Sequence, residues 1–146
     1  MLSIHLRDLY LSNLTKLKEE ISAFKNENDL WHTQSDVKNS PGNLALHLTG
    51  NLNHFIGAQL GNTGFIRNRD LEFADKNIPC TEIITGIDKA MEVVTTVLSN
   101  LTDEDLQKQY PILFLGKQYN TVEILFILYG HLNYHLGQIN YQRRLL

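Results

Sequence analysis

Residues 123–143 read EILFILYGHLNYHLGQINYQR, and no charged side chain lies between the glutamate and the arginine at its two ends. Apolar residues recur at three- and four-residue steps, which predicts a helix with one face toward the protein interior. The segment is nearly as long as a membrane-spanning helix, but histidines and side-chain amides crowd its second half and would be costly in hydrocarbon. We therefore expect a helix packed inside a protein and not a membrane span.

A second stretch without charged residues lies between Lys38 and Arg67. Its start, Ser40-Pro41, is typical of a helix N-cap followed by proline at the first helical position, so we expect a helix from here to about Gly61. Because only two such stretches occur in a chain with 20% charged residues, we expect both to be buried. A histidine inside either stretch must then find partners for its ring nitrogens in the protein, a water or a metal ion.

Two further amphipathic segments bring the number of long helices to four. One spans about residues 3–25, and the other runs over residues 81–101, with Thr81 as its expected cap. Residues 61–80 break the helical period and predict a long crossover between the second and third helices. Residues 109–119 contain a proline and a glycine and predict a small hairpin or an extended loop before the fourth helix. This pattern indicates an all-α four-helix bundle and not a βαβ fold.

The chain has 146 residues, of which 42% are apolar, so we expect one domain, residues 1–146, whose core needs no disulfide. A net charge of −3 with interspersed signs lacks the basic face that nucleic-acid binding requires, and we expect neither a nucleic-acid nor a membrane partner. The single cysteine and the early charges, which leave no apolar signal core, favour a cytoplasmic location. The charges that open the crossover, Arg67, Arg69 and Asp70, are typical of a solvated face.

The spacing of three histidines predicts a metal site. His131 and His135 are four residues apart, which places two helical side chains about 40° around and about 6 Å along the axis from one another, close enough to bind one ion. His47 is expected to point inward from the helix that follows Pro41. Three neutral imidazoles from two facing helices would leave coordination positions for water or substrate, as in catalytic sites. The alternative is that they are ordinary partly buried histidines that bond to the backbone or to water.

Three polar residues are candidates for the surroundings of this site. His54 lies about 10 Å along the helix from His47, too far to share one ion easily. We place it beside the ligands or on the substrate side, and a core histidine whose ring bonds within the protein is the alternative. Asn51, one turn after His47, and Gln138, on the face of His135, are expected to orient ligands or a bound water. Ordinary interior hydrogen bonding is the alternative for both amides. No catalytic acid or base is assigned.

Each helix without charges also contains two glycines seven residues apart, Gly50 with Gly57 and Gly130 with Gly137. A glycine inside a helix costs roughly 1 kcal/mol relative to alanine. We expect a close backbone approach to offset that cost, either between these two helices or across a dimer contact. The sequence does not choose between the two.

Residues 40–47, SPGNLALH, and above all residues 131–139, HLNYHLGQI, resemble the DinB-like superfamily of metalloenzymes. The likeness covers essentially the whole chain. It implies an up-down-down-up four-helix bundle, commonly a homodimer, with a divalent metal held by three histidines, here His47, His131 and His135. It gives no reason to expect DNA binding.

Members of that superfamily with known activities join a low-molecular-weight thiol to an electrophile or carry out a thiol-dependent isomerisation. The resemblance therefore implies a thiol S-transferase of detoxification or stress response, with a small thiol and an electrophile as partners. Three imidazoles suit zinc or nickel first, and also iron or manganese. A metal-dependent hydrolase and a non-catalytic metal- or ligand-binding dimer are the alternatives. No general base such as the glutamate of HExxH is in predicted reach, which favours thiolate activation over hydrolysis.

Overall fold

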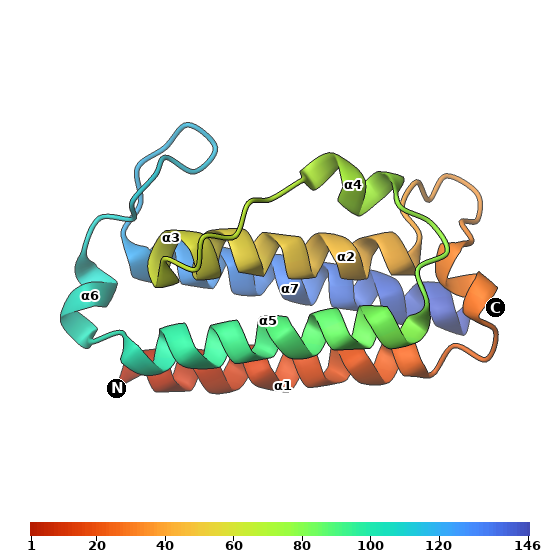
Figure 1. Ribbon diagram of the computed structural model, residues 1–146, viewed down its shortest axis with the longest axis horizontal. Helices are drawn as coiled ribbons and strands as arrows, with labels where there is room; N and C mark the ends of the chain where they lie inside the picture. The colour runs from red at the N-terminus through yellow and green to blue at the C-terminus, as the bar shows by residue number, and fades with distance from the viewer.

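The computed structural model describes residues 1–146 and is all helical, with four long helices packed as a bundle (Figure 1). These are α1 (Leu2–Ser22), α2 (Pro41–Leu52), α5 (Cys80–Asn100) and α7 (Thr121–Arg144). Helices α1 and α7 run in one direction and α2 and α5 in the other. The predicted up-down-down-up four-helix bundle is confirmed. No helix is both long and apolar enough to span a membrane.

The second helix continues beyond α2 to Gly61, as predicted, but its winding changes on the way. The turn η2 (Asn53–Ala58) is π-helical, and a last α-helical turn, α3, spans Gln59–Gly61. At the start of α2, the Ser40 hydroxyl accepts a hydrogen bond from the Asn43 amide at 3.2 Å, and proline occupies the first helical position. The predicted cap is therefore confirmed.

The start of α5 differs from the prediction. The helix begins at Cys80, after Pro79, so Thr81 lies inside the first turn and does not cap it. The acceptor comes from another segment instead, because Oε1 of Glu27, in the 3-10 helix η1 (Glu27–Trp31), accepts a hydrogen bond from the Cys80 amide at 2.9 Å. A carboxylate distant in sequence thus satisfies a donor of the first turn, which a local sequence pattern cannot reveal.

The crossover between α2 and α5 is present, as predicted, but it is not irregular throughout. It contains the short helix α4 (Arg69–Ala74), which packs against α2 (Figure 1). The side chain of Asn68 caps α4 by accepting a hydrogen bond from the Leu71 amide. The crossover therefore places side chains in defined positions beside α2. A second short helix, α6 (Asp103–Gln107), follows α5.

Residues 109–119 form a hairpin-like loop without regular strands. Two isolated antiparallel bridges close it, one between Gln109 and Asn120 and the other between Phe114 and Lys117. The hairpin was one of the two forms predicted for this segment, and its pairing is too short to build a sheet.

A core of 23 buried apolar residues fills the bundle. Helix α2 is buried at most positions, but α7 is buried on one face only. On its outer face Phe126 is 52% exposed, and Tyr134 and Tyr141 are each 66% exposed. The prediction that both stretches without charges are buried is thus wrong for this face, because its apolar and small residues point outward.

Candidate metal centre

Three histidines from two facing helices meet in the bundle. His47 belongs to α2, and His131 and His135 lie one turn apart on α7. Nε2 of His131 is 3.1 Å from Nε2 of His47 and 3.1 Å from Nε2 of His135. All three rings therefore turn the same nitrogen toward one region, and the three candidate ligand atoms lie within 4.8 Å of one another. This group could hold a metal ion.

The two separations of 3.1 Å, from His131 to His47 and from His131 to His135, fit a shared cation. Imidazole nitrogens lie about 2.0–2.1 Å from a zinc ion, which places two of them about 2.9–3.4 Å apart for octahedral to tetrahedral angles. The hydrogens of the rings lead to the same conclusion. His47 and His135 each direct Nδ1 at an oxygen acceptor, so their Nε2 atoms carry lone pairs. His131 has at most one hydrogen on Nε2, so it can donate to only one of these two lone pairs. A cation could accept both of them.

A buried carboxylate contacts the candidate ligand from α2. Nδ1 of His47 donates a hydrogen bond to Oε1 of Glu72 at 3.0 Å, and the Glu72 side chain, on α4, is only 8% exposed. Arg67 binds the same carboxylate with two hydrogen bonds of 2.9 Å, from Nε to Oε2 and from Nη2 to Oε1. A carboxylate in this position fixes the tautomer and the ring orientation of a histidine whose other nitrogen is free to bind a metal.

The two histidines of α7 differ in their partners at Nδ1. Nδ1 of His135 donates to Oε1 of Gln138 at 2.7 Å. Gln138 therefore contacts the His135 ring, on the helix face where we expected it. Nδ1 of His131 is buried without a hydrogen-bond partner, and so is Oδ1 of Asn51. Asn51 is 6% exposed, and it makes no hydrogen bond to the histidines. Its expected orienting role stays a prediction.

The surroundings keep the imidazoles of α7 uncharged. Burial, followed by the charges of His135 and His47 and of Arg67 and Arg69, lowers the pKa of His131 to about 4. Burial also lowers the pKa of His135, against the opposite effect of its hydrogen bond to the neighbouring amide. Neutral imidazole is the form that binds a metal, so both rings are ready as ligands at neutral pH.

Glu72 is charged, and both of its carboxylate oxygens accept hydrogen bonds. Burial alone would raise its pKa, but hydrogen bonds from His47 and Arg67, together with the guanidinium charge, hold the pKa of Glu72 below its usual value. Its Oε1 accepts from both partners and its Oε2 accepts from Arg67. Because both oxygens are occupied on the Nδ1 side of the ring, Glu72 is not a free general base beside Nε2.

Aromatic and basic side chains border the three histidines. The ring of Phe73 lies 4.8 Å from that of His47, and the guanidinium of Arg69 lies 5.1 Å from the Phe73 ring. On α7, the ring of Tyr134 lies 5.2 Å from that of His135. One aromatic ring therefore lies against a ligand of each helix, and a cation stacks on the ring that comes from the crossover.

His54 lies apart from this group. It occurs in the π-helical turn, its ring is 4.6 Å from that of Phe55, and it is not among the three converging histidines. Burial and then Arg67 lower its pKa, while the charge of Glu72 acts in the opposite direction. The structure thus brings His54 near the charged pair of the crossover but not into contact with the candidate ligands, and its place on the substrate side stays a prediction.

The two glycines of the second helix, Gly50 on α2 and Gly57 on η2, do not make the predicted contact with α7. A Cβ on Gly50 would lie 2.6 Å from Cδ of Glu72, and a Cβ on Gly57 would lie 3.0 Å from a valine of α5. Nothing lies within 4 Å of a Cβ on Gly130 or Gly137. The prediction of a close approach between the two helices at these glycines is therefore wrong, because Gly50 contacts the crossover and Gly57 contacts α5. A dimer contact at the α7 pair stays a prediction.

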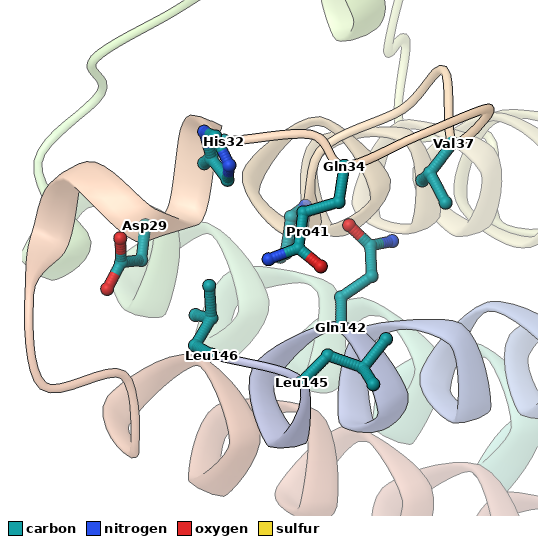
Figure 2. A pocket seen from close by; sticks show the side chains of 8 residues that line it. All are labelled: Asp29, His32, Gln34, Val37, Pro41, Gln142, Leu145 and Leu146. Carbon is teal, nitrogen blue, oxygen red and sulfur yellow. The ribbon is translucent and has the colours of Figure 1, made fainter.

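The site is separate from the pocket shown in Figure 2. That pocket lies between the C-terminal end of α7 and the segment that follows η1. Its lining includes His32, Gln142, Leu145 and Leu146 but none of the three converging histidines. The pocket therefore adds no ligand to the metal centre.

Glu72 is the residue of the site that the sequence analysis missed. It is 25 positions away from His47 and lies two residues after Asp70, the last of the charges that we interpreted as a solvated face. Two signals in the sequence could have pointed to it. Asn68 caps the helix that carries it, and Gly50, one turn after His47, is a glycine that needs a close neighbour.

Comparisons with known proteins give a family but no activity. A family model described as "Protein of unknown function (DUF1572)" matches residues 6–146, which is nearly the whole chain. The comparison with curated proteins finds no match. The function must therefore be inferred from the site.

Proposed function

The chain belongs to the DUF1572 family of proteins of unknown function, and from its three-histidine centre we propose that it is a metal-dependent thiol S-transferase. The observation that carries the proposal is the convergence of three Nε2 atoms, with 3.1 Å from His131 to each of the other two. The resemblance of the histidine segments to the DinB-like superfamily supports the same reading. Detoxification or stress response is the setting that this resemblance favours.

We assign His47, His131 and His135 as the ligands of a divalent ion, with zinc or nickel as the first candidates and iron or manganese as alternatives. When bound, the ion would supply positive charge that lowers the pKa of a thiol or water in its coordination shell. The chain itself supplies the orientation of the ligands. Glu72 and Gln138 accept the Nδ1 hydrogens of two of the rings and so leave Nε2 as the donor atom.

The proposed reaction joins the sulfur of a small thiol to an electrophilic carbon. The thiol gives its proton to solvent, the sulfur lone pair forms the new S–C bond, and the leaving group departs with the electrons of the bond that breaks. Arg69, which stacks on Phe73, adds positive charge near the site and favours the anionic form of sulfur. Phe73 offers an apolar face for the electrophile.

Hydrolysis is less well supported by the same geometry. A hydrolase would use a general base beside the attacking water. Glu72 is the carboxylate in contact with a candidate ligand, and its two oxygens are already bound by His47 and Arg67. Direct use of an activated thiol needs no such base, because the proton can leave to solvent before the S–C bond forms.

We further propose that the protein is a homodimer that pairs through the outer face of α7. Phe126, Tyr134 and Tyr141 are exposed on this face, and Gly130 and Gly137 present open backbone to solvent. Exposed aromatic side chains beside glycines allow two helices to approach closely and to bury apolar area. This face is separate from the buried face of α7, so pairing would leave the core unchanged.

The metal assignment is tested by metal analysis of the purified protein. We expect about one divalent ion per chain in the wild type and a large loss of metal in His135→Ala, because two imidazoles bind an ion far more weakly than three. His5→Ala is the matched control, since His5 is exposed on α1 and should leave the metal content unchanged. Equal metal content in wild type and His135→Ala would remove the proposed site.

The activity is tested with a small thiol and monochlorobimane, in which the S–C bond forms, the C–Cl bond breaks and chloride leaves. We expect the metal-loaded protein to consume thiol faster than the chelator-treated protein, and His135→Ala to resemble the latter. If metal-loaded and chelated proteins react at the same rate while the metal still binds, the non-catalytic binding module becomes the better description.

A further inference from the structure

We propose that Glu72 is a positioning residue for His47, so that the crossover is part of the metal centre. The inference rests on the proposed metal site, because a positioned imidazole has a purpose only if its Nε2 atom binds something. It goes beyond that site by assigning a function to Glu72, Arg67 and Gly50, which lie outside the three-histidine group.

The first step is the choice of tautomer. Oε1 of Glu72 lies 3.0 Å from Nδ1 of His47, and an ionised carboxylate is an acceptor only. Nη2 of Arg67 also lies 3.3 Å from Nδ1 of His47, but it donates to Oε1 of Glu72 at the shorter distance of 2.9 Å. The closer contact with the carboxylate favours the hydrogen of a neutral His47 on Nδ1, which leaves the lone pair on Nε2, the atom that faces His131 at 3.1 Å. A free imidazole has no such constraint, so the carboxylate selects the tautomer that can bind a metal through Nε2.

The second step is the fixation of the carboxylate. Arg67 binds both oxygens of Glu72 in the two-pronged geometry that a guanidinium and a carboxylate favour. The pair is largely buried, since the side chains of Arg67 and Glu72 are only 12% and 8% exposed. Glu72 therefore cannot turn toward solvent without leaving a buried guanidinium without its partner.

The third step is the space that the carboxylate needs. It lies directly over Gly50, where a Cβ would be 2.6 Å from Cδ of Glu72 and closer still to Oε2. Gly50 follows His47 by three residues, so the two lie on neighbouring positions of the same side of α2. The missing side chain at position 50 thus lets a carboxylate from another element reach the imidazole of α2.

The backbone of α4 is held at the same place. Nδ2 of Asn43, one turn before His47 on α2, donates to the carbonyl oxygen of Glu72 at 2.9 Å and to that of Asp75 at 2.8 Å. The ring of Phe73 packs on the imidazole of His47. Side-chain and main-chain contacts therefore attach α4 to the part of α2 that carries the ligand.

These contacts couple the metal to the crossover. A cation at Nε2 keeps the hydrogen on Nδ1 and makes it a stronger donor, which strengthens the bond to Glu72. By linkage, docking of α4 and binding of the metal favour one another. We therefore expect the amides of residues 69–75 to exchange hydrogen more slowly in the metal-loaded protein than in the metal-free protein.

The tautomer is tested without metal. Long-range proton–nitrogen spectra of the histidine side chains in metal-free protein at neutral pH show which ring nitrogen carries the hydrogen. We expect His47 of the wild type to be protonated on Nδ1, and Glu72→Met, which keeps the shape but removes the acceptor, to shift toward the Nε2-protonated form. Asp70→Asn is the matched control, because Asp70 lies on the same helix and is exposed.

The consequence for the metal is tested by competition with a chromophoric chelator for zinc and by the absorption spectrum of the cobalt-substituted protein. Loss of an orienting carboxylate typically weakens metal binding about 10- to 100-fold, and we expect this range for Glu72→Met. Glu72→Gln keeps an oxygen that can accept from Nδ1 and should lie between Glu72→Met and the wild type. Asp70→Asn should leave zinc affinity and the cobalt spectrum as in the wild type, because Asp70 is exposed and contacts no candidate ligand.

Each outcome bears on a different claim. If the tautomer of His47 is the same in Glu72→Met as in the wild type, or if zinc affinity and the cobalt spectrum do not change, Glu72 does not position the ligand and the inference is wrong. If the wild type binds no metal although Glu72 controls the tautomer, the proposed function fails, and with it the purpose of the positioning. Glu72→Gln keeps the experiment decisive if Glu72→Met does not fold.

Discussion

Gly50 lies so close to Glu72 that a Cβ at position 50 would occupy the space of the carboxylate, 2.6 Å from its Cδ. A flexible side chain could ordinarily move aside from such a methyl group. This carboxylate cannot do so freely, because Arg67 and His47 bind both of its oxygens. The glycine is therefore required by a contact between α2 and the crossover, and not by the packing of α2 on α7.

Gly50→Ala tests this relationship through stability. Alanine should favour a helix by roughly 1 kcal/mol over glycine when its methyl group meets nothing, and Gly86 on α5, with nothing within 4 Å of its Cβ, is the matched control. We expect Gly86→Ala to raise the free energy of unfolding by about 0.5–1 kcal/mol and Gly50→Ala to lower it. Urea denaturation of both metal-free variants gives the comparison, and equal stabilisation would show that Glu72 moves aside at no cost.

Gln138 offers a milder perturbation of the same centre. Its Oε1 accepts the Nδ1 hydrogen of His135 at 2.7 Å, so Gln138→Leu leaves that hydrogen without its partner and loosens the ring. We expect zinc affinity to fall about tenfold, at the lower end of the range for outer partners of metal ligands. Gln142→Leu, one turn further along α7, removes a hydrogen bond to the Asn39 carbonyl instead. A titration in which the two variants bind zinc equally would contradict an orienting role for Gln138.

The bundle and the three histidines follow from the sequence because both depend on local periodicity. Apolar residues at helical spacing give the four helices, and the four-residue step from His131 to His135 puts both rings on one face wherever the helix lies. The structure adds that His47 meets them from α2. Spacing within one helix could not prove that contact, since it depends on the register between two helices.

Contacts made across the crossover could not be predicted in the same way. The partner of His47 at Nδ1 is on a six-residue helix, too short for a periodic pattern, and its charges resemble those of a solvated face. The predicted cap of α5, Thr81, was wrong for the same reason, because the acceptor for the Cys80 amide is Glu27. In both places a carboxylate far away in the sequence replaces a local partner, and local patterns carry no information about it.

A contact between α1 and the end of α7 gives a stability that depends on pH. Glu20 accepts hydrogen bonds of 2.7 Å from Nε of Arg143 and from Nδ2 of Asn140. Burial alone would raise the pKa of Glu20, but these hydrogen bonds and the charges of Arg143 and Arg144 hold the pKa of Glu20 below its ordinary value. A carboxyl group whose pKa is lowered by folding stabilises the folded state above the pKa of the unfolded chain.

We therefore expect Glu20→Gln to cost about 1 kcal/mol of unfolding free energy at pH 7, as is usual for a partly exposed ion pair with a shared hydrogen bond. The difference from wild type should shrink as the pH falls below about 4.3, the value for an unfolded glutamate, and vanish below the folded-state pKa. Glu19→Gln, at the exposed neighbouring position, should show no such dependence. Urea midpoints of the wild type and Glu20→Gln at several pH values give this comparison. A stability difference that grows toward acid pH would contradict the prediction.

The outer face of α7 gives the test of the dimer. Gly130 has nothing within 4 Å of a built Cβ, and Phe126 and Tyr134 nearby are largely exposed. An arginine at position 130 would therefore fit a monomer, but in a closely packed pair of α7 helices it would meet its own copy and add like charge to an apolar contact. We expect the wild type to sediment as a dimer at micromolar concentration and Gly130→Arg as a folded monomer with an unchanged helical circular dichroism spectrum. Gly86→Arg places the same side chain in equally open space on α5 and should leave the dimer intact. A monomeric wild type, or a Gly130→Arg dimer of wild-type affinity, would exclude this face as the interface.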